Sequence, residues 1–198
     1  VPGLLDFCMY CVYNGLVDED LYGGKFWKYQ GSKVVYRYLL KKQKDVIAAI
    51  KKEGSFQAQT PFDETVTLCE PYIDHGVKMG EGWLLTAEMV ELIRSGCPNV
   101  VCTQPFACLP NHVVGKATIK ELRRRYPESN IVAVDYDPGA SEVNQLNRIK
   151  LMIAVAKANL AEKEAEARAA RAVARDGAPE EPEAMAASVE VETTEVVE

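Results

Sequence analysis

Residues 100–112 read VVCTQPFACLPNH, and this stretch decides the expected fold because a short apolar run leads directly into a loop of unusual composition. The run at 100–102 is too apolar to face solvent, so it predicts a short buried strand. The loop that follows holds Cys108, His112 and two prolines. A buried strand that ends in soft sulfurs and a Pro-rich loop raises the question of a functional site at its carboxyl end.

The segments around this strand alternate between helical and strand patterns. Residues 84–94 predict a helix because their apolar side chains recur at helical spacing, with Thr86 as the expected N-cap. Residues 113–126 predict a second helix, which has three arginines in its last turn. Residues 130–135 predict a second buried strand, and a long helix is expected to begin at 141 or 142.

This order of elements is typical of parallel βαβ units with right-handed crossovers. The sequence therefore predicts an α/β fold with a Rossmann-like open parallel sheet and flanking helices. Ligands of open parallel sheets bind outside the carboxyl ends of the strands. The loops at 102–112 and 135–141 are accordingly expected to lie together and to form one site.

Composition divides the chain into four parts. We expect a helical or mixed N-terminal portion at 1–78 that continues a larger domain, a Rossmann-like βαβ domain at 79–160, a helical extension at 161–175 and a disordered acidic tail at 176–198. The tail has no aromatic residue and cannot bury enough apolar surface to offset the entropy of ordering. A solvating tail is favoured over an acidic docking segment. The start at Val1, within an apolar segment, favours a piece of a longer protein.

Charge and hydropathy exclude two classes of partner. The formal net charge is −6, but residues 161–198 carry 11 acidic and 4 basic side chains, which leaves about +1 on residues 1–160. A nearly neutral folded part argues against a nucleic-acid partner, because such proteins normally carry a basic patch. No apolar run approaches the length of a membrane helix, and no signal peptide is recognisable. We expect a cytoplasmic protein without a membrane partner.

Six cysteines in such a chain favour metal binding, redox chemistry or burial over disulfides. Cys8 and Cys11 have the spacing of zinc, iron–sulfur and redox sites, but a single pair is more often part of an apolar helix. Cys102, at the end of a strand, favours the core. Cys108 is balanced between a soft metal ligand and a buried thiol in a tight turn. The sequence assigns no role to four cysteines: Cys8, Cys11, Cys69 and Cys97.

Other candidate side chains have a structural alternative that is preferred. Each of the two histidines, His75 and His112, is of a type that binds metals or transfers protons, yet His112 also suits the entry to the next helix. The loop at 79–85 could present Glu81 at the sheet rim, although burial of Trp83 is the favoured interpretation. The sequence has no Walker A loop and no GxSxG or HExxH motif, so it predicts no nucleotide site.

Residues 80–152 resemble the C-terminal region of large proteins related to 2-hydroxyacyl-CoA dehydratase activators. The strings QPFACLPNH and DYDPGASEVNQLNRIKLM carry the resemblance, and residues 26–54 fit the same region more loosely. In that family an ATP-hydrolysing activase is fused to, or works with, modules similar to the dehydratase component and to double-cubane-cluster reductases. The resemblance implies Rossmann-like domains whose loops hold an iron–sulfur cluster, either 4Fe–4S or a double cubane.

The resemblance also implies which residues bind the cluster. Cys108-Leu109-Pro110 matches the Cys-x-Pro turn that follows a strand and precedes a helix in dehydratase-type relatives, so Cys108 is the best-supported iron ligand. Cys102 is the second candidate because it shares the loop. A complete site in these relatives draws cysteines from more than one domain. No catalytic residue is assigned.

Two functions follow as expectations. The first is a cluster-bearing domain that takes part in ATP-driven, low-potential electron transfer in anaerobic metabolism, within an iron–sulfur dehydratase (a lyase) or an ATP-dependent reductase, and inactive alone. Its partners would be an activase module, other dehydratase-like domains and an acyl-CoA substrate. The second is a non-catalytic docking domain that links the activase to its electron acceptor. A structural zinc site of Cys102, Cys108 and His112 is a weaker idea, because the spacing suits a tetrahedral site poorly.

Overall fold

The fold is known from a computed structural model, which describes residues 3–105, 107–136, 139 and 141–176. The chain divides into two compact units, Val1–Lys157 and Ala158–Glu198. Most of the tail expected at 176–198 lies outside the described residues. The elements are α1 (Leu4–Tyr22), α2 (Phe26–Glu53), α3 (Phe62–Leu68), α4 (Gly82–Arg94), β1 (Asn99–Pro105), α5 (Leu109–Asn111), the π-helix η1 (His112–Lys116), α6 (Ile119–Arg125), β2 (Asn130–Tyr136) and α7 (Glu142–Asp176).

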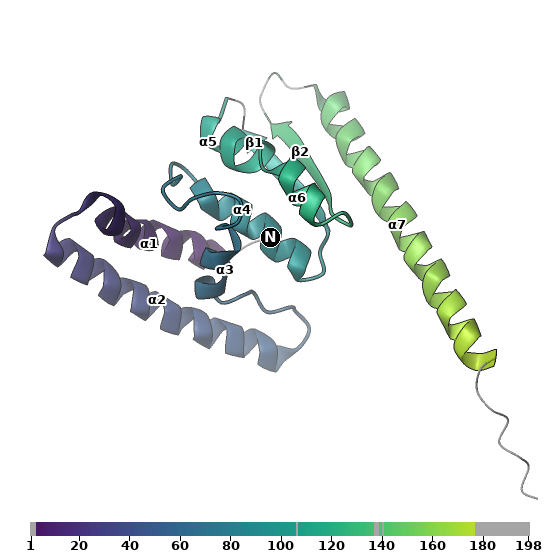
Figure 1. The fold of residues 1–198 in the computed structure, drawn as a ribbon, viewed down its shortest axis with the longest axis horizontal. Coiled ribbons are helices and arrows are strands. Elements are labelled where there is room, and N and C mark those ends of the chain that lie inside the picture. Colours follow the sequence, from purple (N-terminus) through teal and green to yellow (C-terminus); the bar gives the residue numbers. More distant parts are fainter. Residues whose placement is uncertain (1–2, 106, 137–138, 140, 177–198) are drawn as a thin grey trace, which may run out of the picture. The chain divides into compact units, whose positions relative to one another are not determined.

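Helices α1 and α2 form a hairpin in the first unit, with a short turn between them (Figure 1). One side of α2 is buried through Tyr36, Gln43 and Ile47. Gly54 caps the carboxyl end of the helix with a left-handed φ of 82°. Glycine adopts this conformation readily because it has no Cβ. In the described part of the chain, no helix is long and apolar enough to cross a membrane.

The core of the first unit centres on Trp83 in the first turn of α4. The rings of Tyr10, Tyr13, Phe62 and His75 have centroids within 6.3 Å of the Trp83 ring centroid. Trp83 is fully buried, so its expected burial is confirmed. Aromatic side chains bury large apolar areas, and edge-to-face pairs add to that gain. This cluster joins α1, α3 and α4 into one packed layer.

The two strands expected from the sequence are confirmed, and they pair in parallel. The register runs from Asn99 opposite Asn130 to Pro105 opposite Tyr136. Along β1, buried and exposed residues alternate strictly. The buried side chains of β1, such as Val100, belong to the hydrophobic core that α4 shares. The sheet therefore has one face in the core, as a half-buried strand pattern requires.

The predicted fold class, a Rossmann-like open parallel sheet, is wrong. The described residues are mostly helical, with 68% in helices and 8% in strands, and their sheet has two strands. The physical reason is that the described residues before α4 fold into helices and contribute no strand to this sheet. The helix expected at 113–126 is also interrupted, because the chain passes through α5 and η1 before α6. Thr86 is not an N-cap, since it lies buried inside α4 and donates to the Val114 carbonyl at 2.5 Å.

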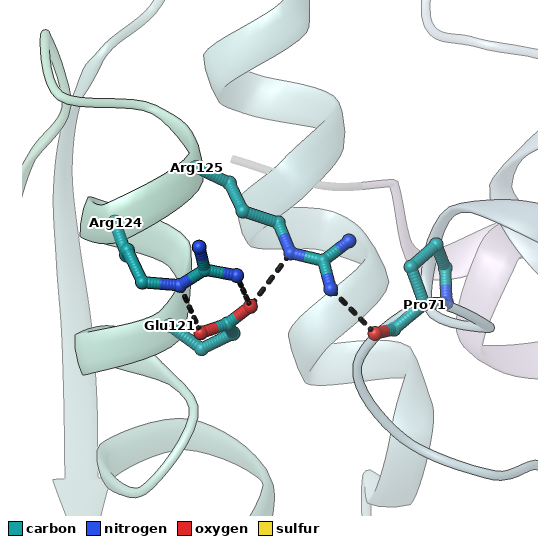
Figure 2. A network of polar contacts seen from close by, with 4 residues as sticks. All are labelled: Pro71, Glu121, Arg124 and Arg125. Carbon is teal, nitrogen blue, oxygen red and sulfur yellow. Dashed lines mark hydrogen bonds and ion pairs between the residues drawn. The ribbon is translucent and has the colours of Figure 1, made fainter.

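Ion pairs within the carboxyl end of α6 hold Arg125 where it donates a hydrogen bond to the loop before α4 (Figure 2). The Glu121 carboxylate accepts hydrogen bonds from both Arg124 and Arg125, at 2.7 to 2.8 Å. Arg125 also donates to the Pro71 carbonyl at 3.3 Å. These guanidinium groups hold the pKa of Glu121 at about 2. Because the three arginines of α6 lie in its last turn, they also complement the helix dipole.

Candidate functional site

The carboxyl end of β1 turns sharply into α5, and Cys108 sits at this turn. Its backbone is extended, its N–H donates to the Pro105 carbonyl at 3.2 Å, and its carbonyl accepts from His112 N–H at 3.1 Å. Ala107, the residue before it, has a φ of 55°, which is rare for a residue with a Cβ. The Cys108 side chain is half-buried. The turn thus presents one partly accessible thiol at the sheet rim.

Cys102 points into the core and not toward this rim. Its side chain is 3% exposed, and its sulfur accepts a hydrogen bond from Gln104 Nε2 at 2.9 Å. Burial raises the pKa of the Cys102 thiol. A thiol must lose its proton to bind iron or zinc, so this environment disfavours a ligand role.

The predicted metal site is therefore not assembled. Among the described residues, no group of three or more His, Cys, Asp or Glu side chains could hold a metal ion. The expected iron–sulfur and metal-binding character of the chain is corrected on this finding, because the described residues hold no metal-binding group of their own. The physical cause is the alternation of β1, which turns the Cys102 side chain into the core. A zinc site of Cys102, Cys108 and His112 is not formed either, because the Cys102 side chain lies in the core and these three residues form no metal-binding group. The assignment of Cys108 and Cys102 as ligands of a cluster that other domains complete stays a prediction.

Two buried side-chain amides lie at the same rim, and the sequence analysis did not predict them. Gln104 is fully buried and Asn111 is 4% exposed, yet Gln104 Oε1 and Asn111 Oδ1 have no hydrogen-bond partner among the described residues. An unsatisfied buried acceptor is costly, by roughly 1–3 kcal/mol. Gln104 could have been found as a polar residue at a buried position of the strand alternation. The lack of a partner for either group is visible only in three dimensions.

A second polar group lies at the carboxyl end of β2. Lys116 Nζ lies 2.8 Å from Asp135 Oδ1, and this ammonium lowers the pKa of the Asp135 carboxyl. A small hollow of about 180 Å³ lies beside Asp135. Its lining is polar and consists of Asp135, Ser141, Asn144, Gln145 and Arg148. The loops that follow both strands thus carry polar side chains, as the parallel topology predicts.

The remaining candidates have structural roles. His75 lies in the aromatic core, with Nε2 at 2.9 Å from the Val66 carbonyl, so it is a core histidine. Cys69 is fully buried, and burial raises its pKa to about 12. His112 follows α5 and begins η1, in agreement with the preferred interpretation as an entry to the next helix. Three cysteines are exposed: Cys8, Cys11 and Cys97.

The free edge of β2 is covered by side chains. Its outward carbonyls each accept a hydrogen bond from a flanking helix: Arg123 donates to Ile131 O, Arg148 Nη1 to Ala133 O at 2.9 Å, and Gln145 Nε2 to Asp135 O at 2.9 Å. Such side chains occupy the acceptors that an added strand would need. This edge is closed to further pairing in the way that natural proteins protect sheet edges.

The opposite edge of the sheet, on β1, is open. Asn130 N–H donates to Pro98 O at 2.8 Å, and the alternation of a parallel ladder then directs the backbone groups of Val101 and Thr103 away from β2. Within the described residues, no hydrogen bond joins these outward groups to another element. The side chains of Val101 and Thr103 are exposed as well. The sheet therefore has one covered edge and one edge that is free to pair.

Comparisons of the chain with protein-family models, with curated proteins and with solved structures gave no match. The resemblance of residues 80–152 to the activator-related proteins stays a prediction.

Proposed function

We propose that this chain is a non-catalytic docking domain that binds a partner by adding the partner's strand to the open edge of β1. The observation that carries the proposal is the asymmetry of the sheet: three side chains cover the β2 edge, whereas no hydrogen bond from the residues that the structure describes covers the outward groups of Val101 and Thr103 on β1. Strand addition uses backbone hydrogen bonds for affinity and side chains for specificity.

The composition of β1 supports this mode of binding. The strand reads NVVCTQP and has no charged residue, although lysine or an inward charge commonly protects an edge strand. A two-stranded sheet is marginal alone and gains stability from a third strand. The exposed side chains of Val101 and Thr103 have the β-branched shape that packs well across strands.

The resemblance of residues 80–152 supplies the first partner to test. We propose that the partner is an ATP-hydrolysing activase module, which this domain attaches to the protein that accepts its electrons, in the cytoplasm. Nearly neutral charge on residues 1–160 suits a partner that is recognised by backbone pairing more than by charge.

Amide hydrogen exchange tests the docking mode residue by residue. We expect the outward amides of Val101 and Thr103 to exchange fast in the isolated chain and to become at least about tenfold slower when a purified activase module is added. The inward amide of Cys102 is the internal control, because pairing with β2 protects it already. If the activase binds and the two outward amides stay fast, strand addition is wrong. If the activase does not bind, the assigned partner is wrong.

The competing function is tested by anaerobic measurement of iron and acid-labile sulfide after reconstitution. The docking proposal predicts that the chain retains neither. Stoichiometric iron and sulfide that disappear in a Cys108→Ala variant would overturn the non-catalytic proposal in favour of electron transfer.

A further inference from the structure

Cys8 and Cys11 form a pair of exposed thiols on α1, outside the site at the sheet rim. Both side chains are exposed and free, and α1 runs without interruption from Leu4 to Tyr22. Residues three apart on a helix are neighbours on its surface. The buried residues of this part of α1, Met9 and Tyr10, lie between them in sequence and face the core instead. The two thiols therefore share the outer face of the helix.

Helical geometry brings the two cysteines close enough to join. With a rise of 1.5 Å and a rotation of 100° per residue on a cylinder of radius about 2.3 Å, Cα atoms three apart are separated by about 5 Å. A disulfide needs a Cα separation of about 4.4–6.8 Å. Partial burial and the neighbouring Cys8 raise the pKa of Cys11, which is consistent with two sulfurs in electrostatic reach of each other. The Cβ atoms of residues three apart on a helix lie about 5–6 Å from each other, and a disulfide needs about 3.5–4.5 Å, so closing the bond requires a local adjustment of α1 of about 1–2 Å.

The surface beside Cys11 is accessible to a small reagent. Cys11 lines an open groove of about 390 Å³ between α1 and α2. Lys28 and Asp18 both line this groove, and Asp18 forms an ion pair with Lys78. Among the described residues the Lys28 ammonium makes no ion pair. A cation at this position favours the approach of an anionic molecule.

We propose that Cys8 and Cys11 are a surface dithiol that an anionic low-molecular-weight disulfide, of the glutathione class, oxidises to an intrachain disulfide. The Cys11 thiolate attacks one sulfur of the reagent, forms a mixed disulfide and releases one thiolate. The Cys8 thiolate then attacks the Cys11 sulfur, forms the intrachain bond and releases the second thiolate. The protein loses two protons and two electrons, and the reagent is reduced to two thiols. This proposal does not depend on the docking function.

The full chain is incubated in glutathione buffers from reducing to oxidising, remaining thiols are trapped with a maleimide, and intact mass counts them. Six thiols are expected in the reduced chain. Closure of the pair is expected to remove two of them with no glutathione retained on Cys8 or Cys11, and an adduct on the exposed Cys97 is counted separately by its added mass. Peptide mapping locates the bond. Thiolate is the reactive form. At pH values below the thiol pKa, the rate of closure is therefore expected to rise roughly tenfold for each unit by which the pH increases.

Serine variants separate this pair from the other exposed thiol. Cys8→Ser and Cys11→Ser are each expected to abolish the intrachain disulfide and to keep a glutathione adduct on the remaining cysteine. Cys97→Ser, at an exposed thiol outside the pair, is expected to close normally. The proposal is overturned if either pair variant still forms an intrachain disulfide, which intact mass shows as two thiols lost with no glutathione added. The proposal is also overturned if Cys8 and Cys11 of the unmodified chain carry only glutathione adducts. The same holds if both stay reduced in a buffer that already modifies Cys97.

Discussion

Asp6 is a carboxyl group that folding removes from water. Its side chain is 2% exposed, and Oδ1 accepts hydrogen bonds from Gln43 Nε2 at 2.7 Å and Gln59 Nε2 at 3.3 Å. Burial and the negative charge of Glu91 raise the pKa of Asp6 from 3.8 to about 6. The folded protein therefore binds this proton more tightly than the unfolded chain does. It follows that the free energy of unfolding falls as pH rises from about 4 to 6.

Asp6→Asn removes this penalty while keeping an acceptor oxygen for Gln43. We expect the variant to be more stable at pH 7, by up to about 3 kcal/mol, since one pKa unit corresponds to about 1.4 kcal/mol. We also expect its stability to vary less between pH 4 and 6. Urea denaturation at several pH values measures both effects.

Asp45→Asn is the matched control for Asp6. Asp45 is an exposed carboxylate that lies 3.4 Å from Lys42 on α2, and an exposed pair of this kind contributes little. We expect the free energy of unfolding of Asp45→Asn to equal that of the unmodified chain at each pH. A loss of stability at pH 7 in Asp6→Asn, with Asp45→Asn unchanged, would show that the charge on Asp6 is favourable in the folded state.

At the scale of elements, the sequence predicted what depends on local pattern. Both strands were found because β-branched runs lie between turn residues, and α4 was found from its apolar period. The break of 113–126 into α5, η1 and α6 was missed, since it depends on packing. A Cβ on Gly115 would lie 2.9 Å from Gln104 Nε2, so a larger residue would require the buried Gln104 side chain to move. This contact joins two different elements, β1 and η1, and the pattern within either segment does not predict it.

The sequence placed Cys108 correctly in the fold, whereas it did not show that Cys102 is buried away from the same rim. The carboxyl end of β1 does carry Cys108 in a tight turn, as the sequence indicated. The partner assumed for it, Cys102, faces the core, because strand alternation sets the direction of each side chain. The number of strands could not be predicted either, because the pattern in 1–78 alone did not separate a helical portion from a mixed one.

Proline substitutions in β1 test which backbone groups face outward. Thr103→Pro removes an N–H that points away from β2, so we expect a loss of less than about 1 kcal/mol. Cys102→Pro removes an N–H of the β1–β2 ladder and fills a core position, so we expect a loss of at least about 3 kcal/mol. Circular dichroism during urea denaturation measures both. Equal losses would contradict the assigned orientation of the strand, and with it the open edge.

At the scale of the whole molecule, α7 belongs to both compact units. The described hydrogen bonds between α7 and β2 come from its first part, through Gln145, Arg148 and the carbonyl of Met152, which accepts from Asn130 at 2.9 Å. These residues lie in the first unit, which ends at Lys157. The covered edge of the sheet therefore needs residues 142–157 and does not need the chain that follows.

Two truncations test this division. A chain that ends at Lys157 keeps every hydrogen bond that covers β2, so we expect its free energy of unfolding to stay within about 1 kcal/mol of the full chain. A chain that ends at Ser141 loses the two covering bonds from Gln145 and Arg148 and the bond from Asn130 to Met152 O, at about 1 kcal/mol each, and partly exposes the β2 edge. We expect it to be about 3 kcal/mol less stable and to self-associate, as urea denaturation and light scattering would measure. Equal stability of the two truncated chains would mean that α7 does not protect the sheet, and a large loss in the longer one would mean that the units stabilise each other.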